Sequence, residues 1–189
     1  MEGISGVVLA GGLGRRMGGL DKGLVEFRGR PLIAHVLERL APQVDEILIN
    51  ANRNADTYAR FGHRVIADAV GGYAGPLAGL HAGLRSATRS CVLTVPCDSP
   101  FLPLDLAARL ARALAARRAD LAVAKTGNRP HPVFALVRRA VLPHLEAFLE
   151  AGGRKIDAWY ATLAAVEVAF DDEVEAFRNL NTPEELAQA

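Results

Sequence analysis

Cysteine is scarce in this chain, which contains two, Cys91 and Cys97, among 189 residues. If both lie on one extended strand, they are roughly 20 Å apart, which is too far for a disulfide. The spacing therefore excludes a disulfide between them, and a metal-binding or redox-active pair is not indicated either. We expect two buried free thiols.

An excess of charge is also missing. Lys and Arg number 22 and Asp and Glu number 21, so the formal net charge is +1. A protein that binds nucleic acid in general needs a clearly basic surface, and we therefore expect no nucleic-acid partner. Any anion-binding site must be local.

Long apolar runs are absent too. No stretch approaches the roughly 20 residues that span a bilayer, and no basic segment followed by an apolar stretch and cleavage site opens the chain. We expect no membrane contact and a cytoplasmic location. With 50% hydrophobic and 23% charged residues, the composition suits one folded domain over residues 1–189.

Strand-like and helix-like patterns alternate along the chain. The segment Ile4–Ala10 and the run Ile47–Ile49 are continuous apolar stretches, which are typical of parallel strands covered on both faces. The expected strands are 4–10, 44–50, 64–67, 91–95, 120–125, 133–137 and 165–170. Helices are expected at 31–42, 55–61, 138–150 and 154–163 and after residues 76, 103 and 183, and a polar loop at 126–132. The alternation predicts an α/β fold with a mostly parallel sheet and helices on both faces.

Polar residues follow four successive expected strands. A glycine-rich loop follows the first strand, and Asn50, Asp68 and Asp98 follow the next three. The carboxyl ends of parallel strands share one edge of a sheet, where ligands bind in such folds. We therefore expect these residues to converge. Asp98 alone would be better explained as a helix cap or a turn-forming residue, but the glycine-rich loop favours the convergent site.

The loop after the first strand has the composition of a polyphosphate site. Between Gly11 and Lys22 it contains five glycines and the two cations Arg15 and Arg16. Glycines let backbone N–H groups approach an anion, and Arg and Lys donate charge-assisted hydrogen bonds to phosphate oxygens. The plain alternative is a glycine-rich turn on a solvated basic surface.

Two common phosphate-binding motifs fit poorly. A P-loop would need Lys and then Ser or Thr after its last glycine, but Leu20 follows Gly19. The dinucleotide fingerprint fails at Met17, and the second strand ends at Asn50, where an acidic residue would be expected.

The segments Leu9-Ala10-Gly11-Gly12, Arg16-Met17-Gly18-Gly19 and Asp21-Lys22-Gly23 resemble instead the signature loop of nucleotidyltransferases with a Rossmann-like fold. Within that superfamily the sequence resembles molybdenum cofactor guanylyltransferase, since cytidylyltransferase relatives usually carry Leu-Ala-Ala-Gly first. The resemblance continues at 76–79, 129–132 and 179–185 and so covers nearly the whole chain. It implies a three-layer fold of the nucleotide-diphospho-sugar transferase type.

The resemblance also implies a set of nucleotide contacts, namely Leu9, Ala10, Gly11, Gly12, Lys22, Asn50, Asp68 and Asp98. In this family the residue at Lys22 binds the phosphates, those at Asn50 and Asp68 contact the nucleoside, and that at Asp98 binds the nucleotide and the cofactor Mg²⁺. Arg16 is expected to join Lys22 and Asp98 as a catalytic residue, because a forked guanidinium holds two phosphate oxygens.

The implied reaction joins GTP to molybdopterin, with or without bound molybdenum, and releases pyrophosphate. Residues 1–100 would bind GTP and Mg²⁺, and residues 101–189 would bind molybdopterin. We expect Arg129, His131, Asn179 and Asn181 to contact this acceptor. Its terminal phosphate is already ionised near neutral pH, so no strong general base is needed. Transient contacts with proteins that supply molybdopterin and receive the product are also expected.

Alternatives of two kinds remain at this point. A relative with the same chemistry would use CTP, or a sugar 1-phosphate as acceptor, whereas a protein of another class would carry GTP or the finished cofactor without making it. Trp159 and Tyr160 are either core residues or a wall of the acceptor site. The remaining histidines, His35, His63, His81 and His144, are expected to be packing or surface residues.

Overall fold

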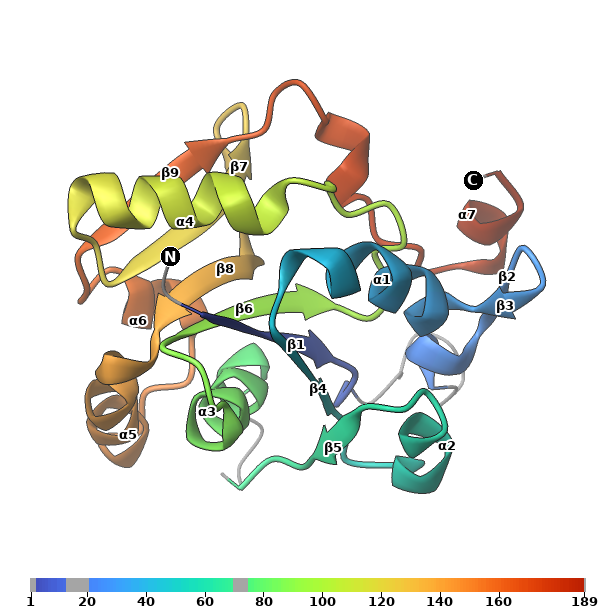
Figure 1. Cartoon of the computed structure of the whole chain (residues 1–189), viewed down its shortest axis with the longest axis horizontal. Coiled ribbons are helices and arrows are strands. Elements are labelled where there is room, and N and C mark those ends of the chain that lie inside the picture. The colour runs from blue at the N-terminus through green and yellow to red at the C-terminus, as the bar shows by residue number, and fades with distance from the viewer. Residues whose placement is uncertain (1–2, 13–20, 70–74, 189) are drawn as a thin grey trace.

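The computed structural model describes residues 3–12, 21–69 and 75–188 (Figure 1). In this part of the chain, seven strands form one sheet in the order β5-β4-β1-β6-β8-β7-β9. The strands are β1 (Ile4–Leu9), β4 (Glu46–Asn50), β5 (Arg64–Ile66), β6 (Cys91–Pro96), β7 (Leu121–Thr126), β8 (Arg129–Arg138) and β9 (Ala165–Ala169). The pairs β1–β4, β1–β6, β4–β5 and β7–β9 are parallel, and β8 runs antiparallel to β6 and β7. The expected α/β fold with a mostly parallel sheet is confirmed.

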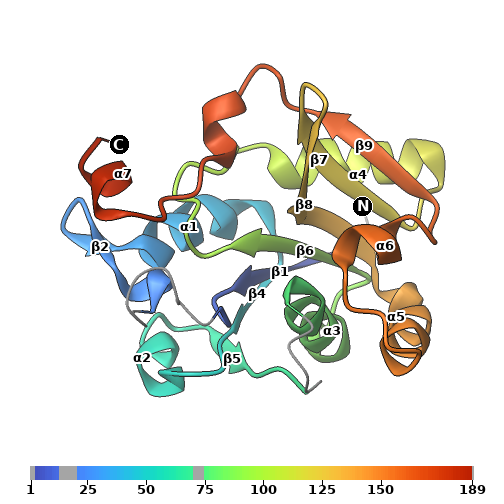
Figure 2. The ribbon, with the colours of Figure 1, turned by 180° about the vertical axis from the view of Figure 1, so that it is seen from behind.

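Helices cover both faces of the sheet (Figures 1 and 2). The α-helices are α1 (Leu32–Leu40), α2 (Ala55–Ala59), α3 (Pro76–Ser86), α4 (Leu106–Arg117), α5 (Leu142–Glu150), α6 (Ile156–Tyr160) and α7 (Pro183–Gln188). One apolar core lies between the sheet and α1, α2 and α4, and a second lies between the sheet and α3, α5 and α6. Val7 belongs to the second core and its neighbour Val8 to the first, as the two-residue period of a strand requires.

Helix α1 illustrates how the pattern of apolar residues becomes packing. Its five apolar side chains recur at helical spacing and all are buried, namely Leu32, Ile33, Val36, Leu37 and Leu40. Burial of each such side chain contributes roughly 1.5–3 kcal/mol, whereas Glu38 on the opposite face is exposed. The expected helix is confirmed.

A small third apolar cluster lies at the edge of the domain. The hairpin of β2 (Glu26–Phe27) and β3 (Arg30–Pro31) packs through Phe27 onto Leu32 and onto Leu180, which precedes α7. Figures 1 and 2 both place α7 beside this hairpin. The predicted capping box at α7 is confirmed, because Thr182 Oγ1 accepts from Glu185 N at 3.2 Å and Glu185 Oε2 accepts from Thr182 N at 3.1 Å. The cluster holds the segment 179–181 in place.

The prediction of a polar loop at 126–132 was wrong for most of this range. Strand β8 begins at Arg129, and Gly127 and Asn128 alone form the turn from β7. Pairing of β8 with β6 begins at Ala135. Pro130 and Pro132 lie before that point, in a part of β8 that is not paired with β6. Proline is tolerated in such a position because no hydrogen-bond donor is required there.

Other local expectations need smaller corrections. Helix α6 is shorter than expected at 154–163, and the 3₁₀ turn Val174–Phe177 was not expected. Trp159 and Tyr160 are both buried in the second core, in agreement with the core alternative. Cys91 and Cys97 are buried free thiols, as predicted.

Candidate functional site

The carboxyl ends of β1, β4, β5 and β6 lie side by side, which confirms the predicted convergence. Leu9 is opposite Asn50 of β4 and opposite Pro96 of β6. Two backbone hydrogen bonds continue the pairing beyond the strands, from Ala10 N to Asn50 O at 2.8 Å and from Cys97 N to Leu9 O at 3.2 Å. The first described residues after these strands, which include Ala10, Ala51 and Cys97, are therefore held together, and we call this edge of the sheet the rim.

On one side of the rim, Asp68 is held by two asparagines. Asn50 Nδ2 donates to Asp68 Oδ1 at 2.8 Å, and Asn52 Nδ2 donates to Asp68 Oδ2 at 2.7 Å. Asn52 Oδ1 also accepts from Asp68 N at 2.9 Å, so it fixes both the main chain and the side chain of the aspartate. The structure thus joins Asn50 to Asp68 as expected. It adds Asn52, whose position just after a strand was the available signal in the sequence.

Glycines make room for these side chains. A Cβ on Gly11 would lie 2.8 Å from Asn52 Nδ2, and one on Gly79 of α3 would lie 2.6 Å from Asn50 Oδ1. Both distances are too short for a real Cβ, so a methyl group at either position would displace the asparagine side chain beside it. A Cβ on Gly12, in contrast, would have no described atom within 4 Å.

On the other side of the rim, Lys22 meets Asp98. Lys22 Nζ lies 3.4 Å from Asp98 Oδ2 and donates to Asn181 Oδ1 at 2.5 Å. Lys22 belongs to the 3₁₀ turn Lys22–Leu24, and Asp98 follows β6. Three segments from the beginning, the middle and the end of the chain thus converge on one ammonium group.

Asp98 is buried beneath the segment that contains Asn179 and Asn181. Its backbone carbonyl accepts from Leu180 N at 2.9 Å, and Ser99 Oγ donates to Asn179 Oδ1 at 2.7 Å. Burial raises the pKa of the Asp98 carboxyl, and the nearby Lys22 opposes that rise. A buried carboxylate beside one cation is a suitable ligand for a hard divalent ion.

A cleft of about 410 Å³ adjoins this pair. All four residues predicted for the acceptor line it, namely Arg129, His131, Asn179 and Asn181. His131 Nε2 lies 2.9 Å from Thr126 Oγ1, and the His131 ring stacks on Phe177 with centroids 4.5 Å apart. Phe177 is a lining residue that nothing in the local sequence pattern indicated. Burial, followed by repulsion from Arg129, lowers the pKa of His131, which favours the neutral ring.

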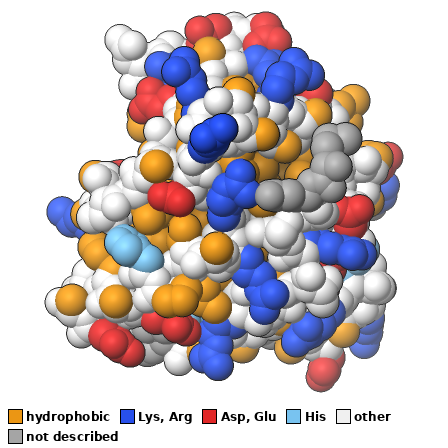
Figure 3. All heavy atoms as spheres, turned by 60° about the vertical axis from the view of Figure 1, so that its left-hand side comes forward, with side chains coloured by type: hydrophobic (Ala, Val, Ile, Leu, Met, Phe, Trp, Pro, Cys, Tyr) orange, Lys and Arg blue, Asp and Glu red, His pale blue; other side chains and the backbone are white. Residues whose placement is uncertain are grey.

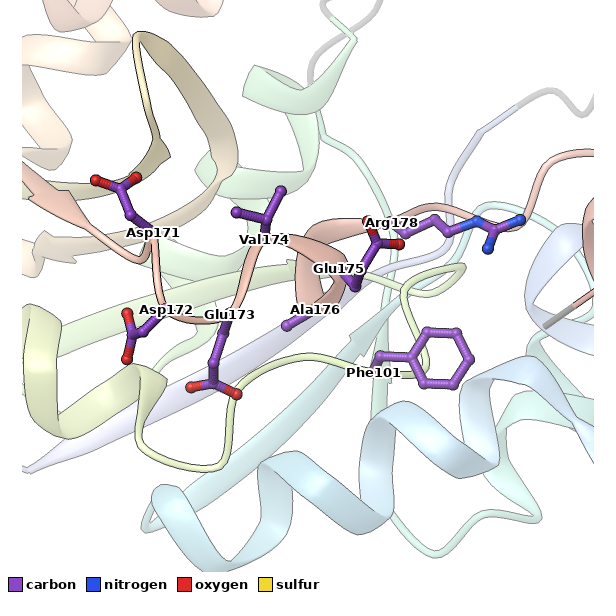
Figure 4. A pocket seen from close by; sticks show the side chains of 8 residues that line it. All are labelled: Phe101, Asp171, Asp172, Glu173, Val174, Glu175, Ala176 and Arg178. Atoms are coloured by element: carbon purple, nitrogen blue, oxygen red, sulfur yellow. The ribbon is translucent and has the colours of Figure 1, made fainter.

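A second hollow, of about 600 Å³, lies along the 3₁₀ turn Val174–Phe177 (Figure 4). Its lining includes four carboxylates, Asp171, Asp172, Glu173 and Glu175, along with Phe101, Val174, Ala176 and Arg178. Asp172 is paired with Arg109 at 2.9 Å. An anionic phosphate compound would be repelled by this lining, so the rim and the first cleft are the better substrate site.

Several other expectations can be compared with the described residues. Arg16 lies outside them, as does the stretch 13–20 of the glycine-rich loop. Within them, no cluster of three or more His, Cys, Asp or Glu residues is arranged to hold a metal ion. Of the helices that the structure describes, none has the length and apolarity needed to cross a membrane. On the face in Figure 3, Lys and Arg are interspersed with acidic and apolar side chains.

Three of the four remaining histidines contact other side chains or the backbone, and His63 is half-buried. His81 is buried on α3 with Nε2 3.3 Å from Glu146 Oε1, and His144 Nδ1 accepts from Trp159 Nε1 at 3.0 Å. His35 Nε2 lies 2.9 Å from Phe27 O. These three contacts agree with the expected packing roles.

Comparison with known proteins identifies the family to which this rim belongs. Residues 6–166 match the MobA-like NTP transferase domain. The chain belongs to the MobA-like NTP transferase family. The match spans β1, β4, β5 and β6 as well as the whole of β8.

Similar proteins carry a consistent name. The chain is 50% identical to a molybdenum cofactor guanylyltransferase of Shewanella halifaxensis over 98% of this chain and 92% of that protein. It is 51% identical to another from Shewanella putrefaciens over 98% and 95%. Among solved structures, molybdopterin-guanine dinucleotide biosynthesis protein A from Archaeoglobus fulgidus is similar, with a TM-score of 0.79 and 28% identity over 97% of this chain and 95% of that one.

Proposed function

We propose that this protein transfers GMP from GTP to the terminal phosphate of molybdopterin, yielding molybdopterin guanine dinucleotide and pyrophosphate. The observation that carries the proposal is the contact of Lys22 with Asp98 and Asn181. This contact lies where the rim meets the cleft of about 410 Å³, which we call the acceptor-side cleft. Family membership and the names of relatives 50% identical to the chain support the same reaction.

Residues of the rim bind the nucleotide in this proposal. The pair of Asn50 and Asp68 offers amide and carboxylate groups to the nucleoside, with Asp68 accepting from guanine N–H groups or ribose hydroxyls. Leu9, Ala10, Gly11 and Gly12 supply backbone groups to the nucleotide at the end of β1. Lys22 binds phosphate oxygens, and we expect Arg16 to bind oxygens of the same phosphates.

Asp98 is the proposed ligand for Mg²⁺. Magnesium takes few protein carboxylates and completes its shell with phosphates and water, which fits a single buried carboxylate without a cluster of further acidic side chains in the described part of the site. When bound, the ion neutralises charge on the triphosphate. Lys22, at 3.4 Å from Asp98, adds a second positive charge at the same position.

The acceptor-side cleft orients molybdopterin toward the α-phosphorus of GTP. Arg129 and the amides of Asn179 and Asn181 offer donors to its phosphate and polar ring atoms, and the His131–Phe177 stack supplies an aromatic surface. A phosphate oxygen of the acceptor forms a bond to the α-phosphorus while the bond from that phosphorus to the bridging oxygen breaks. Pyrophosphate leaves with that oxygen, and no general base is required because the attacking oxygen is already ionised. Residues 1–100 thus serve the nucleotide and residues 101–189 mainly the acceptor.

Release of pyrophosphate tests the reaction. Purified protein with Mg²⁺ and molybdopterin would be given GTP, CTP or ATP in turn, and a sugar 1-phosphate would replace molybdopterin in a parallel arm. We expect pyrophosphate with GTP and molybdopterin. Release with CTP alone would assign a cytidylyltransferase. Protection of the protein against heat by GTP without any release of pyrophosphate would identify a carrier and overturn the proposal.

A further inference from the structure

Asp21, directly before Lys22, is held by two side chains from the segment that follows β4. Tyr58 OH donates to Asp21 Oδ1, and Asn54 Nδ2 donates to Asp21 Oδ2 at 3.0 Å. Both carboxylate oxygens are therefore occupied by donors from one short stretch of chain. A carboxylate that accepts from two fixed donors has little freedom to rotate.

The two donors are themselves fixed relative to each other. Asn54 adopts a left-handed backbone conformation with φ of 53° immediately before α2, and its carbonyl accepts from Thr57 N at 2.9 Å and Tyr58 N at 3.0 Å. Tyr58 is fully buried in the first core. Burial and the hydrogen bond to Asp21 raise the pKa of Tyr58, so its hydroxyl remains a donor.

The turn that contains Lys22 lies directly against this tyrosine. A Cβ on Gly23 would be 2.6 Å from Tyr58 OH and 3.3 Å from Cys97 Cβ, so the turn is packed between α2 and the end of β6. Asp21 O also accepts from Leu24 N at 3.0 Å, which closes the turn around Lys22. The direction in which Lys22 leaves the backbone is thus determined by the Asp21 contacts.

The same segment holds the nucleoside side of the rim at its other end. Asn50 and Asn52 bind Asp68, and within eight residues of Asn50, Asn54 and Tyr58 bind Asp21. A short, rigid stretch of chain therefore connects the group proposed to contact the nucleoside with the group proposed to contact the phosphates. Base and phosphates of one nucleotide are covalently joined, so the distance between them is limited, and such a spacer would keep both contacts within that distance.

We infer that Asp21, whose carboxylate is held by Asn54 and Tyr58, is a positioning residue that directs Lys22 toward the phosphates. This inference rests on the proposed binding of a nucleoside triphosphate at the rim. Tyr58→Phe removes one donor and leaves the packed ring in place. Loss of a hydrogen bond to a charged group corresponds to a roughly tenfold or greater effect. We expect the dissociation constant of GTP to rise by about this factor, while that of guanosine changes little.

Tyr160→Phe is the matched control. Tyr160 is also buried, and its hydroxyl donates to Pro132 O at 2.8 Å on the other face of the sheet. Both variants lose one buried hydroxyl, so thermal unfolding would register both. The ratio of the GTP to the guanosine dissociation constant would rise in Tyr58→Phe and stay at the wild-type value in Tyr160→Phe.

Asn54→Gly supplies an independent second variant, because Asn54 is exposed and glycine accepts its left-handed backbone without strain. It removes the other donor to Asp21 and should raise the same ratio. If wild-type protein binds GTP but both Tyr58→Phe and Asn54→Gly keep the wild-type ratio, the inference is overturned and the proposed function stands. Wild-type protein that binds no nucleoside triphosphate would overturn both, so the two failures are distinguishable without any measurement of turnover.

Discussion

Lys22 Nζ lies 3.4 Å from Asp98 Oδ2, although 76 residues separate the two in the chain. The contact follows from the direct pairing of β1 with β6, which sets Leu9 opposite Pro96 and brings the loops after these strands together. Asn181 then adds a third segment through its bond to Lys22. The contact between Lys22 and Asp98 therefore depends on the order of the strands in the sheet.

Asp98→Ala should reduce turnover by roughly 10²- to 10³-fold, which is the typical loss for one charge contact made in the transition state. Folding should suffer little, because burial already disfavours the charged carboxyl. Initial rates of pyrophosphate release with saturating GTP would measure the effect. Asp172→Ala, which removes an exposed carboxylate paired with Arg109, is the control and should leave the rate near wild type. Comparable rates for both variants would contradict the role of Asp98.

Lys22→Ala should weaken the binding of GTP roughly 10- to 100-fold, because it removes a charge-assisted hydrogen bond to phosphate. The binding of guanosine should be nearly unchanged. Titration calorimetry with both ligands would measure the difference. Lys125→Ala is a matched control because Lys125 also pairs with a carboxylate, that of Glu167 at 3.0 Å, but away from the rim. Equal weakening of GTP and guanosine in Lys22→Ala would mean that Lys22 does not contact phosphate.

Gly79→Ala should weaken guanosine and GTP by a similar factor of about five, because the added methyl group would displace Asn50 and cost about one hydrogen bond. Gly83→Ala lies one turn further along α3 and would meet Val7 Cγ2 at 2.8 Å, a core contact. Both variants share the helix-propensity gain and the strain of overpacking. Nucleoside affinity should therefore fall in Gly79→Ala alone, and a fall of the same size in Gly83→Ala would oppose this prediction.

Arg129→Ala should raise the KM for molybdopterin about fivefold, the worth of an exposed ion contact, and leave GTP affinity unchanged. Arg129 is exposed at the mouth of the acceptor-side cleft, so the effect should shrink as salt is added. Steady-state kinetics at two ionic strengths would measure it. An increase in the KM for GTP with none for molybdopterin would reverse the proposed assignment of the two halves.

His131 should make the protein less stable at mildly acidic pH. Its pKa is lowered in the folded state, so as pH falls through the ordinary value of 6.5 the unfolded state takes up a proton first. The free energy of unfolding therefore decreases from that pH down to the folded-state pKa and is not reduced further below it. Denaturant titrations at about pH 7.5 and about pH 5.5 should give a smaller difference for His131→Asn than for wild type. An identical difference would count against this assignment.

The sequence was sufficient to predict the sheet and one side of the site. Buried strands are continuous apolar runs, and polar residues at their ends, such as Asn50 and Asp98, must converge once the strands are parallel. The capping box at Thr182 and Glu185 is local and was equally predictable. Lys22 and Asp98 could be associated because each carries the residue type that a magnesium triphosphate requires.

Contacts made by tertiary packing were not visible in the sequence. Tyr58 reads as an apolar helix residue, yet its hydroxyl binds Asp21, and Phe177 gives no periodic signal because it lies in a 3₁₀ turn. Two prolines favoured a loop at 126–132. The first part of β8 is not paired with β6, however, so proline breaks no hydrogen bond between these strands. Each case depends on a neighbour that is distant in the chain.

The bond between Lys22 and Asn181 joins residues 159 positions apart. Because ribosomes build polypeptides from the amino end, Lys22 exists long before its amide partner is added. A nascent polypeptide that has already made β1, β4 and β6 still lacks this partner. Completion of the centre is thus a late event in biogenesis, and an incompletely translated product would contain the glycine-rich loop without the group that steadies its lysine.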